Sequence, residues 1–247
     1  MYFIVGDIGN TSTRICLIKK SKIKKSFIFD TKKIFEQGFI RRLFKKFSKI
    51  ETKKRLLFSS VVPLAFKKIK SDLKKLSYEI LEIKTLKLNK LIKINIKNIK
   101  QLGSDRIVNS IAGKKFKNCL IIDFGTATTF DIVKNKVYEG GVIAPGVKLS
   151  MKNLSQSTAL LPIFKLKNKQ KSYGKNTIDA LNAGFVWGYD GLINNIINKI
   201  IQKWKMKYKI ILTGGYAMFF KKIIKKKTII DQNITIKGLS KAYRELL

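Results

Sequence analysis

The amino-terminal part of the chain alternates short apolar runs with polar turns, a pattern typical of β-strands. It predicts strands at residues 2–6, 13–19 and 24–30. Apolar residues then recur every four positions, which is close to the period of a helix. We therefore expect a helix that Thr31 caps, with an apolar face made of Phe35, Phe39, Leu43 and Phe47.

A second strand–helix–strand pattern follows. The run "RLLFSSVV" (55–62) predicts a buried strand, and Pro63 suits the first turn of the next helix because no N–H is needed there. Residues 78–83 predict another strand. The stretch 84–102 is rich in lysine and asparagine without clear periodicity, so we expect a crossover there between two halves.

The second half restarts the order of the first, so we expect two α/β halves, residues 1–100 and 101–247. A helix is predicted from near Ser104, then strands at 119–124 and 127–133 and a hairpin that runs into "EGGVIAPG". A long helix after Asn176, a strand at 208–212 and a helix at 238–246 complete it. One apolar stripe of the long helix contains Ile193, Ile196, Ile197, Ile200, Ile201 and Trp204.

The same small turn occurs once in each half. The stretches "VGDIGNTSTR" and "IDFGTATTFD" each have an aspartate at the end of an apolar run, a glycine two positions on and a threonine six positions on. Glycine lets the backbone turn tightly and approach a ligand. Successive N–H groups and threonine hydroxyls can bind an anion, and the aspartate offers an oxygen ligand to a cation.

These features together predict two hairpins that face one another across a cleft and hold a nucleoside triphosphate. The alternative is a pair of ordinary tight hairpins, because Asp-x-Gly-x-Thr is a common pattern. Two copies in corresponding positions of two α/β halves favour the phosphate-binding interpretation.

The charge of the chain is strongly positive, with 53 Lys+Arg against 15 Asp+Glu and a formal net charge of +38. Such a balance is typical of proteins that bind nucleic acids or anionic surfaces. Only six of the basic residues are arginines, the usual readers of phosphates and guanines, and the lysines are spread along the whole chain. We therefore favour compositional drift toward lysine and expect no specific nucleic-acid partner. Lysine runs such as "KKIIKKK" are interpreted as solvated faces.

The composition also restricts the chemistry. Histidine is absent from the 247 residues, which excludes Ser-His-Asp and Cys-His mechanisms and histidine-ligated metal sites. Cys16 and Cys119 have neither zinc-site spacing nor the number for a disulfide framework, so we expect reduced core thiols in a cytosolic protein. We expect neither a signal peptide in "MYFIVGDIGN" nor a membrane span, which needs about 18 uninterrupted apolar residues.

Seven short motifs occur in one order over almost the whole chain. They are "DIGNTSTR" (7–14), "LGSDR" (102–106), "DFGTATTFD" (123–131), "GGVIAPG" (140–146), "STALLP" (157–162), "GKNT" (174–177) and "ILTGG" (211–215). The duplicated hairpins resemble the phosphate-binding elements of the acetate kinase, sugar kinase, heat-shock ATPase and actin superfamily. Within it, the combination of motifs is similar to type III pantothenate kinase. The resemblance implies a duplicated actin-like (ribonuclease H-like) α/β fold around a nucleotide cleft.

The resemblance also implies roles for individual residues. The first phosphate-binding loop for ATP would consist of Asp7, Gly9, Asn10, Thr11, Ser12, Thr13 and Arg14, with Asp7 close to the Mg²⁺ that ATP carries. Thr126 would contact ATP, and Asp123 would bind K⁺ or NH₄⁺. Pantothenate would contact Gly103, Ser104, Asp105, Arg106 and Thr177, with Asp105 as the proton acceptor. The family implies a cytoplasmic homodimer at the first step of coenzyme A synthesis.

Several of these residues have a plainer interpretation. Asp105 follows a predicted helix start, where the helix dipole favours a carboxylate. Arg106 could be a structural ion-pair partner, and Thr177 a helix cap. The glycines of "EGGVIAPG" and "LTGG" could simply permit turns, and we interpret Phe185, Trp187 and Tyr189 as packing residues.

One stretch departs from the family pattern. The family usually carries a tyrosine and a proline shortly before the "LGSDR" motif, and "IKINIKNIKQ" (92–101) has neither. The sequence therefore leaves one side of the pantothenate pocket undetermined. The predicted function is ATP-dependent phosphorylation of pantothenate. The alternatives are a kinase for another small hydroxylated substrate and a basic nucleic-acid-binding or transcription accessory protein.

Overall fold

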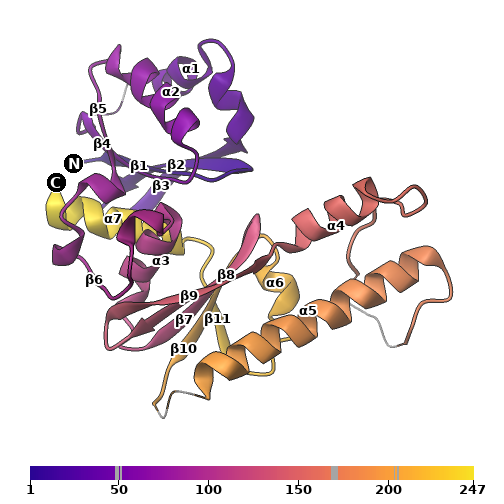
Figure 1. Cartoon of the computed structure of the whole chain (residues 1–247). Coiled ribbons are helices and arrows are strands. Elements are labelled where there is room, and N and C mark those ends of the chain that lie inside the picture. The colour runs from indigo at the N-terminus through magenta and orange to yellow at the C-terminus, as the bar shows by residue number, and fades with distance from the viewer. Residues whose placement is uncertain (48–49, 51, 168–171, 203, 205) are drawn as a thin grey trace. The chain divides into compact units, whose positions relative to one another are not determined.

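The strands of the protein form two sheets (Figure 1). The computed structural model describes residues 1–47, 50, 52–167, 172–202, 204 and 206–247. No helix in these ranges is long and apolar enough to cross a membrane.

The first sheet has the strand order β3-β2-β1-β4-β5. Its strands are β1 (Phe3–Ile8), β2 (Ser12–Lys19), β3 (Lys22–Asp30), β4 (Arg55–Ser60) and β5 (Glu79–Glu82). The first three form an antiparallel meander, and β4 and β5 continue the sheet parallel to β1. These strands confirm the sequence prediction, and Pro63 begins α2 (Pro63–Lys74) as expected.

The predicted continuous helix after Thr31 is wrong. The chain forms a short 3₁₀ helix, η1 (Thr31–Phe35), and then α1 (Phe39–Lys45). Gly38 lies between them with a φ of 69°, a left-handed conformation that interrupts a right-handed helix. The cap of the first helix is the side chain of Asp30, which accepts a hydrogen bond from the Lys32 N–H at 2.9 Å.

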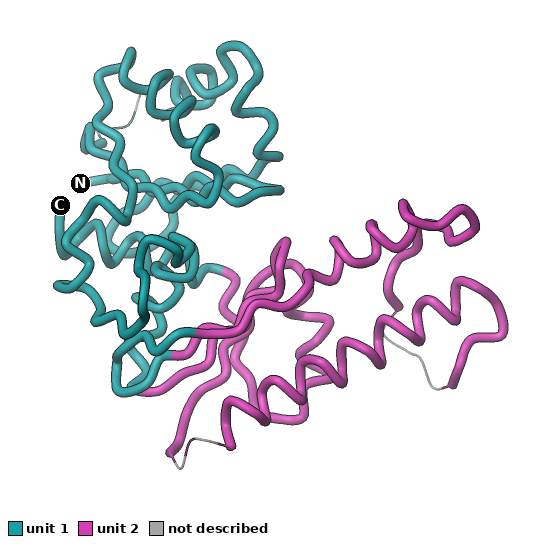
Figure 2. The backbone as a smooth tube through the Cα atoms, in the orientation of Figure 1, with its two compact units in different colours: residues 1–117, 133–140, 233–247 teal, residues 118–132, 141–232 magenta. Residues whose placement is uncertain are grey.

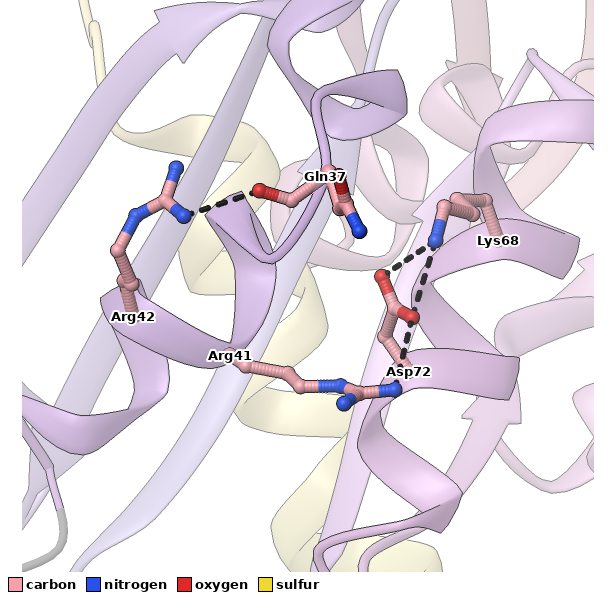
Figure 3. A network of polar contacts seen from close by, with 5 residues as sticks. All are labelled: Gln37, Arg41, Arg42, Lys68 and Asp72. Carbon is pink, nitrogen blue, oxygen red and sulfur yellow. Dashed lines mark hydrogen bonds and ion pairs between the residues drawn. The ribbon is translucent and has the colours of Figure 1, made fainter.

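Helices α1 and α2 are joined by a buried carboxylate (Figure 3). Asp72 on α2 is 5% exposed, and its two oxygens accept hydrogen bonds from Lys68 Nζ at 3.0 and 2.9 Å. Arg41 of α1 lies 3.9 Å from the same carboxylate. A buried charge is tolerated only when it is paired, and these two cations supply the pairing.

The first sheet is covered on both faces. Ile4, Ile8 and Phe58 pack against apolar side chains of η1, α1 and α2. On the other face, Val5 and Leu57 pack against α3 (Ser104–Gly113) and α7 (Ile234–Leu246). Helices α3 and α7 approach each other closely at Gly238. A Cβ at this position would lie 1.9 Å from the carbonyl oxygen of Val108, so the contact needs glycine.

Tyr243 on α7 anchors that helix to the first sheet. Its ring stacks on Phe3 with a centroid distance of 4.2 Å, and its hydroxyl donates to the carbonyl oxygen of Arg55 at 2.9 Å. Burial raises the pKa of Tyr243 to about 12, so the hydroxyl keeps its proton.

The stretch expected to be a crossover contains short pieces of structure. These are η2 (Ile83–Thr85), η3 (Leu88–Lys90), β6 (Lys93–Ile94) and η4 (Ile99–Gln101). β6 adds to the second sheet in parallel with β9. The sequence signal was weak there because pieces of two or three residues are too short to show a period.

The second sheet has the order β11-β10-β7-β8-β9-β6. Its other strands are β7 (Cys119–Phe124), β8 (Ala127–Lys134), β9 (Val137–Pro145), β10 (Lys209–Gly214) and β11 (Thr228–Ile230). The order β9-β8-β7-β10-β11 repeats the order β3-β2-β1-β4-β5. In the first sheet β4 and β5 run parallel to β1, and in the second sheet β10 and β11 run parallel to β7. The expected duplication is therefore present in the strand order.

Three helices accompany the second sheet: α4 (Val147–Gln156), α5 (Thr177–Ile201) and α6 (Ala217–Phe220). The long helix α5 confirms the prediction, and its stripe packs into the apolar core, although Trp204 lies beyond the end of the helix. The sequence did not predict α4, α6 or β11. The first of these buries only Val147 and Met151, so its apolar face is thin.

Two interpretations from composition are confirmed. The lysines of "KKIIKKK" are exposed, whereas Ile224 within the run is buried. Both cysteines are buried free thiols, and burial raises the pKa of the Cys16 thiol.

The described chain divides into two compact units (Figure 2). Unit 1 comprises residues 1–117, 133–140 and 233–247, and unit 2 comprises residues 118–132 and 141–232. Unit 1 contains segments from both ends of the chain, because helices α3 and α7 both pack on the first sheet. The predicted boundary between two duplicated halves at residue 100 stays a prediction.

Candidate active site

The first predicted phosphate loop is the tight turn between β1 and β2 in unit 1. The Gly9 N–H donates to the carbonyl oxygen of Ser12 at 3.0 Å and closes the turn. Asn10, Thr11 and Ser12 are exposed at its tip, where they are accessible to a ligand. Thr13 is fully buried, so its side chain supports the turn from within.

Thr31 fastens this turn from the start of η1. Its hydroxyl donates to the carbonyl oxygen of Gly9 at 2.7 Å, and its backbone N–H donates to the carbonyl oxygen of Thr11 at 3.1 Å. The hydroxyls of Thr13 and Thr31 lie 3.0 Å apart, and since Thr31 already uses its proton, Thr13 is the donor. Thr31 is thus part of the loop's support, not the helix cap that the sequence indicated.

We expect Thr31→Val to loosen the loop and lower stability. Valine has nearly the same shape but leaves the Gly9 carbonyl and the Thr13 hydroxyl without this partner, at a cost of about 1–3 kcal/mol. The midpoint of urea unfolding should fall, while Thr31→Ser, which keeps the hydroxyl, should retain most of the stability. Equal midpoints for the valine variant and the wild type would contradict this role.

Asp7 stands at the end of β1 in a row of polar residues across the first sheet. It pairs with Ser59 of β4 on one side and with Arg14 of β2 on the other. The Ser59 hydroxyl donates to Asp7 Oδ1 at 2.8 Å, and Arg14 Nε donates to Ser26 Oγ at 3.0 Å. Opposite charges on neighbouring strands attract each other, so the row favours a carboxylate at this end of the sheet.

Asp105 lies in the first turn of α3, after the N-cap residue Gly103. Its Oδ1 accepts a hydrogen bond from the Arg106 N–H at 2.8 Å, as a carboxylate at a helix start does. A Cβ at Gly103 would lie 2.4 Å from Oδ1, so glycine leaves the space that this carboxylate occupies. Burial raises the pKa of Asp105, and the Arg106 N–H and guanidinium only partly offset that effect.

Ser104 is another polar residue at the start of α3. It is 1% exposed, and within the described residues its hydroxyl has no hydrogen-bond partner. A buried hydroxyl without a partner is costly, and such groups commonly mark places where a ligand or water completes the site. Arg106 is partly buried in the same turn.

The second predicted phosphate loop is the turn between β7 and β8 in unit 2. The Gly125 N–H donates to the carbonyl oxygen of Ala127 at 3.1 Å, and Thr126 is exposed at the tip. Asp123 is partly buried just before the turn. The loop therefore has the same design as the first, with an aspartate at the strand end and an exposed hydroxyl at the tip.

Two glycines from other motifs close around this second loop. A Cβ at Gly146 would lie 1.9 Å from the carbonyl oxygen of Thr126. Gly214 has a φ of 84°, and a Cβ there would lie 2.5 Å from Asp123 Oδ1. Glycine is therefore required by close packing against the Asp123 loop, and the motifs "GGVIAPG" and "ILTGG" do more than permit turns.

Thr177 is the first residue of α5, but it is not the cap. Asn176 caps the helix by accepting a hydrogen bond from the Asp179 N–H at 2.9 Å. Thr177 is exposed and lies at the edge of a groove of about 630 Å³ in unit 2. The groove is mainly apolar and is lined by side chains that include Leu154, Leu161, Leu181, Phe185 and Leu192.

Of the three aromatic residues interpreted as packing residues, Phe185 and Tyr189 pack in the apolar core of unit 2, whereas Trp187 is exposed and the interpretation is wrong for it. Phe185 lies edge-on to Phe164 and stacks on Tyr189, whose hydroxyl donates to Ser150 at 2.9 Å. Trp187 is 47% exposed.

No cluster of three or more cysteine, aspartate or glutamate side chains that could hold a metal ion occurs in the parts of the chain that the structure describes. Mg²⁺ does not need such a cluster, because it is commonly bound through one or two carboxylates together with substrate phosphates.

The strand order places the chain in a class of proteins, those with a duplicated actin-like, ribonuclease H-like fold. A crystal structure from Cytophaga hutchinsonii, provisionally named as a sugar kinase, is similar with a TM-score of 0.54 and 13% identity, over 99% of this chain and 100% of that one. One from Campylobacter jejuni, provisionally named as a Baf family transcriptional activator, has a TM-score of 0.63 and 21% identity over 98% of both chains. At these identities the likeness shows the fold, and it confirms the predicted fold class.

The chain belongs to the type III pantothenate kinase family. The family model matches residues 3–199. A curated type III pantothenate kinase from Pelagibacter ubique is 49% identical over 243 residues, which cover 97% of each chain. The resemblance drawn from the seven motifs is thereby confirmed. As a kinase, the protein uses ATP together with a divalent metal ion.

Proposed function

We propose that the chain catalyses the ATP-dependent phosphorylation of pantothenate to 4′-phosphopantothenate, the first step of coenzyme A biosynthesis. The family match over residues 3–199 carries this proposal. The oxygen of the substrate's primary hydroxyl forms a bond to the γ-phosphorus of ATP. The bond from that phosphorus to the β–γ bridging oxygen breaks, ADP leaves, and the hydroxyl proton passes to a base.

Asp105 is the proposed base. Phosphoryl transfer passes through a loose transition state, so the base orients the hydroxyl and takes its proton late, as the bond to phosphorus forms. The burial that raises the pKa of Asp105 makes its carboxylate a better proton acceptor than an exposed aspartate. The Arg106 N–H bound to Oδ1 fixes the direction of the carboxylate.

The start of α3 is the proposed pantothenate-binding segment. Gly103 leaves room for the Asp105 carboxylate, and the buried hydroxyl of Ser104 is available to a polar group of the substrate. Arg106 supplies positive charge for the carboxylate of pantothenate. Thr177 is the further proposed contact, from the start of α5.

ATP is proposed to bind to both hairpin loops. In the first, Gly9, Asn10, Thr11 and Ser12 form the exposed tip, and Thr13 holds it from within. Arg14 adds positive charge beside Asp7. In the second, the exposed Thr126 offers its hydroxyl to the nucleotide.

Two cations are proposed to assist. Asp7 would hold the Mg²⁺ of ATP, and its position at the strand end, with Ser59 already oriented on Oδ1, fits a hard oxygen ligand. Asp123 would hold K⁺ or NH₄⁺, and its place near the end of β7, just before the turn of the second loop, fits an oxygen ligand for such a cation. Both cations supply positive charge that offsets the charge of the phosphates in the transition state.

An ADP-release assay tests the proposal. Purified protein with ATP and Mg²⁺ should release ADP only when pantothenate is added, because the acceptor hydroxyl completes the reaction. Release that is equally fast without pantothenate, or that requires a different small hydroxylated compound, would contradict the proposal and favour a kinase for another substrate.

The protein is further proposed to act in the cytoplasm as a homodimer, through the apolar groove of unit 2. Gly184, Gly188 and Gly191 of α5 are exposed, and a Cβ at any of them would meet nothing within 4 Å. Glycine inside a helix costs about 1 kcal/mol relative to alanine, so packing within the chain does not explain them. Leu160 and Ile163, which flank the groove residue Leu161 in the chain, are 90% and 82% exposed. A second copy of the chain would cover both features.

We expect the wild type to have the mass of a dimer by light scattering, and Leu160→Asp to shift it toward the monomer. A charge in an apolar interface loses its water without gaining a partner. Leu64→Asp is the matched control, because Leu64 is a similarly exposed leucine at 71% on α2. A monomeric wild type, or equal dissociation by both variants, would contradict the proposed interface.

A further inference from the structure

Ser59 is a buried hydroxyl that sequence reasoning did not single out. It lies on β4, which pairs in parallel with β1 so that Ser59 is directly beside Asp7. Its side chain is fully buried, and its Oγ donates a hydrogen bond to Asp7 Oδ1 at 2.8 Å. The two residues are 52 positions apart in the chain, so only the sheet brings them together.

This bond has two physical consequences. A hydrogen bond to an ionised carboxylate is stronger than one between neutral groups, and it favours the charged form. It also restricts rotation of the Asp7 carboxyl group. The donor belongs to a buried residue of β4 whose position is fixed, so rotation of the carboxyl group would break the hydrogen bond. The second carboxylate oxygen of Asp7 is therefore held in one direction relative to the sheet end.

We propose that Ser59 is a positioning residue for Asp7, which orients the carboxylate toward the divalent cation that the nucleotide carries. The inference rests on the proposed role of Asp7 and adds a residue that acts through it. Ser59 itself touches neither the nucleotide nor the cation.

The neighbouring serine provides a control. Ser60 is the next residue of β4, and its side chain points to the opposite face of the sheet, as alternation in a strand requires. Its hydroxyl exchanges hydrogen bonds with the backbone of Val62, at 3.2 Å for both contacts. Ser60→Ala therefore removes a hydroxyl from the same strand without touching Asp7.

The test compares binding of a non-hydrolysable ATP analogue by calorimetry with Mg²⁺ and with a chelator. We expect Ser59→Ala to weaken binding about tenfold or more in Mg²⁺, the usual size of a lost bond to a charged group, and less than about twofold in chelator. Ser60→Ala should bind as the wild type does in both conditions. If Ser59→Ala does not fold, Ser59→Cys, with a weaker donor of similar shape, should show the same Mg²⁺-specific loss.

The Asp7→Asn background shows whether Ser59 acts through Asp7. If it does, adding Ser59→Ala to Asp7→Asn should cause no further loss of Mg²⁺-dependent binding. Wild-type binding by Ser59→Ala, an equal loss with and without Mg²⁺, or a full additional loss in the Asp7→Asn background would each overturn the inference. So would an Asp7→Asn variant with unchanged Mg²⁺ dependence.

The same preparations separate this inference from the proposed function. A wild type that binds the analogue in a Mg²⁺-dependent way but does not turn over pantothenate would remove the proposed substrate. The positioning role of Ser59 would then still be decided by the calorimetry, because that measurement needs no acceptor.

Discussion

Asp105→Asn is expected to reduce turnover of pantothenate at least about 100-fold, since general-base contributions run to about 10²–10⁴-fold. Asparagine keeps the shape and can still accept the hydrogen bond from the Arg106 N–H. It also caps or flanks a helix start about as well as aspartate does. What it cannot do is accept the proton of the substrate hydroxyl. Turnover is measured by ADP release, and ATP affinity by calorimetry.

Asp105→Asn is also expected not to lower the stability of the protein. Because burial raises the pKa of Asp105, its protonated carboxyl group contributes stability that is fully present below the unfolded pKa and is lost as the pH rises through the folded pKa. At neutral pH its charge is thus a cost that asparagine removes, so the melting temperature of the variant should not fall. In the wild type, the acid limb of the rate profile should lie above the ordinary aspartate pKa of 3.8.

The control for this variant is Glu79→Gln, which neutralises an exposed carboxylate of the same unit paired with Arg55. It should leave turnover unchanged. An Asp105→Asn variant within tenfold of the wild-type rate would rule out Asp105 as the base. Loss of ATP binding together with turnover would show that Asp105 has a structural role.

Activity is expected to be at least about tenfold higher in K⁺ or NH₄⁺ than in Na⁺, and Asp123→Asn should abolish this difference. A cation near the phosphates stabilises the charge of the transition state, and single electrostatic contacts of this kind contribute about 10²–10³-fold to turnover in other enzymes. The substituted asparagine would retain the size of the side chain but, without the negative charge, would bind a cation much less well. The rates are measured by ADP release at constant ionic strength.

Asp190→Asn is the matched control, because Asp190 is a carboxylate of unit 2 that accepts a hydrogen bond from the side-chain amide of Asn194 on the same helix. It should keep the wild-type ratio of activity in K⁺ to activity in Na⁺. Equal activity of the wild type in Na⁺ and in K⁺ would remove the assignment of Asp123. An Asp123→Asn variant that is still activated by K⁺ would place the cation elsewhere.

The fold was predictable where local signals agreed with tertiary packing. The meander of β1 to β3 follows from alternating apolar residues, and Pro63 and Asn176 mark the starts of α2 and α5. The prediction failed after Thr31 because apolar spacing continues through Gly38, where the backbone itself is left-handed. The spacing of apolar residues indicates which side chains face the core. It does not indicate whether the backbone between them stays helical.

The candidate site was predictable only in part. The loops around Asp7 and Asp123 and the start of α3 follow from short motifs within the chain. The support of these loops does not, because Thr31 reaches Gly9 from 22 residues away and Ser59 reaches Asp7 from 52 residues away. Single serines and threonines carry no local signal of such bonds, which depend on strand pairing.

The most direct test of the central claim is identification of the product. The protein is incubated with ATP, Mg²⁺, K⁺ and pantothenate, and the products are analysed by mass spectrometry and phosphorus NMR. We predict a phosphomonoester of pantothenate at its primary hydroxyl, formed in equal amount with ADP. ADP without phosphorylated pantothenate, or pantothenate recovered unchanged while another acceptor is phosphorylated, would contradict the account.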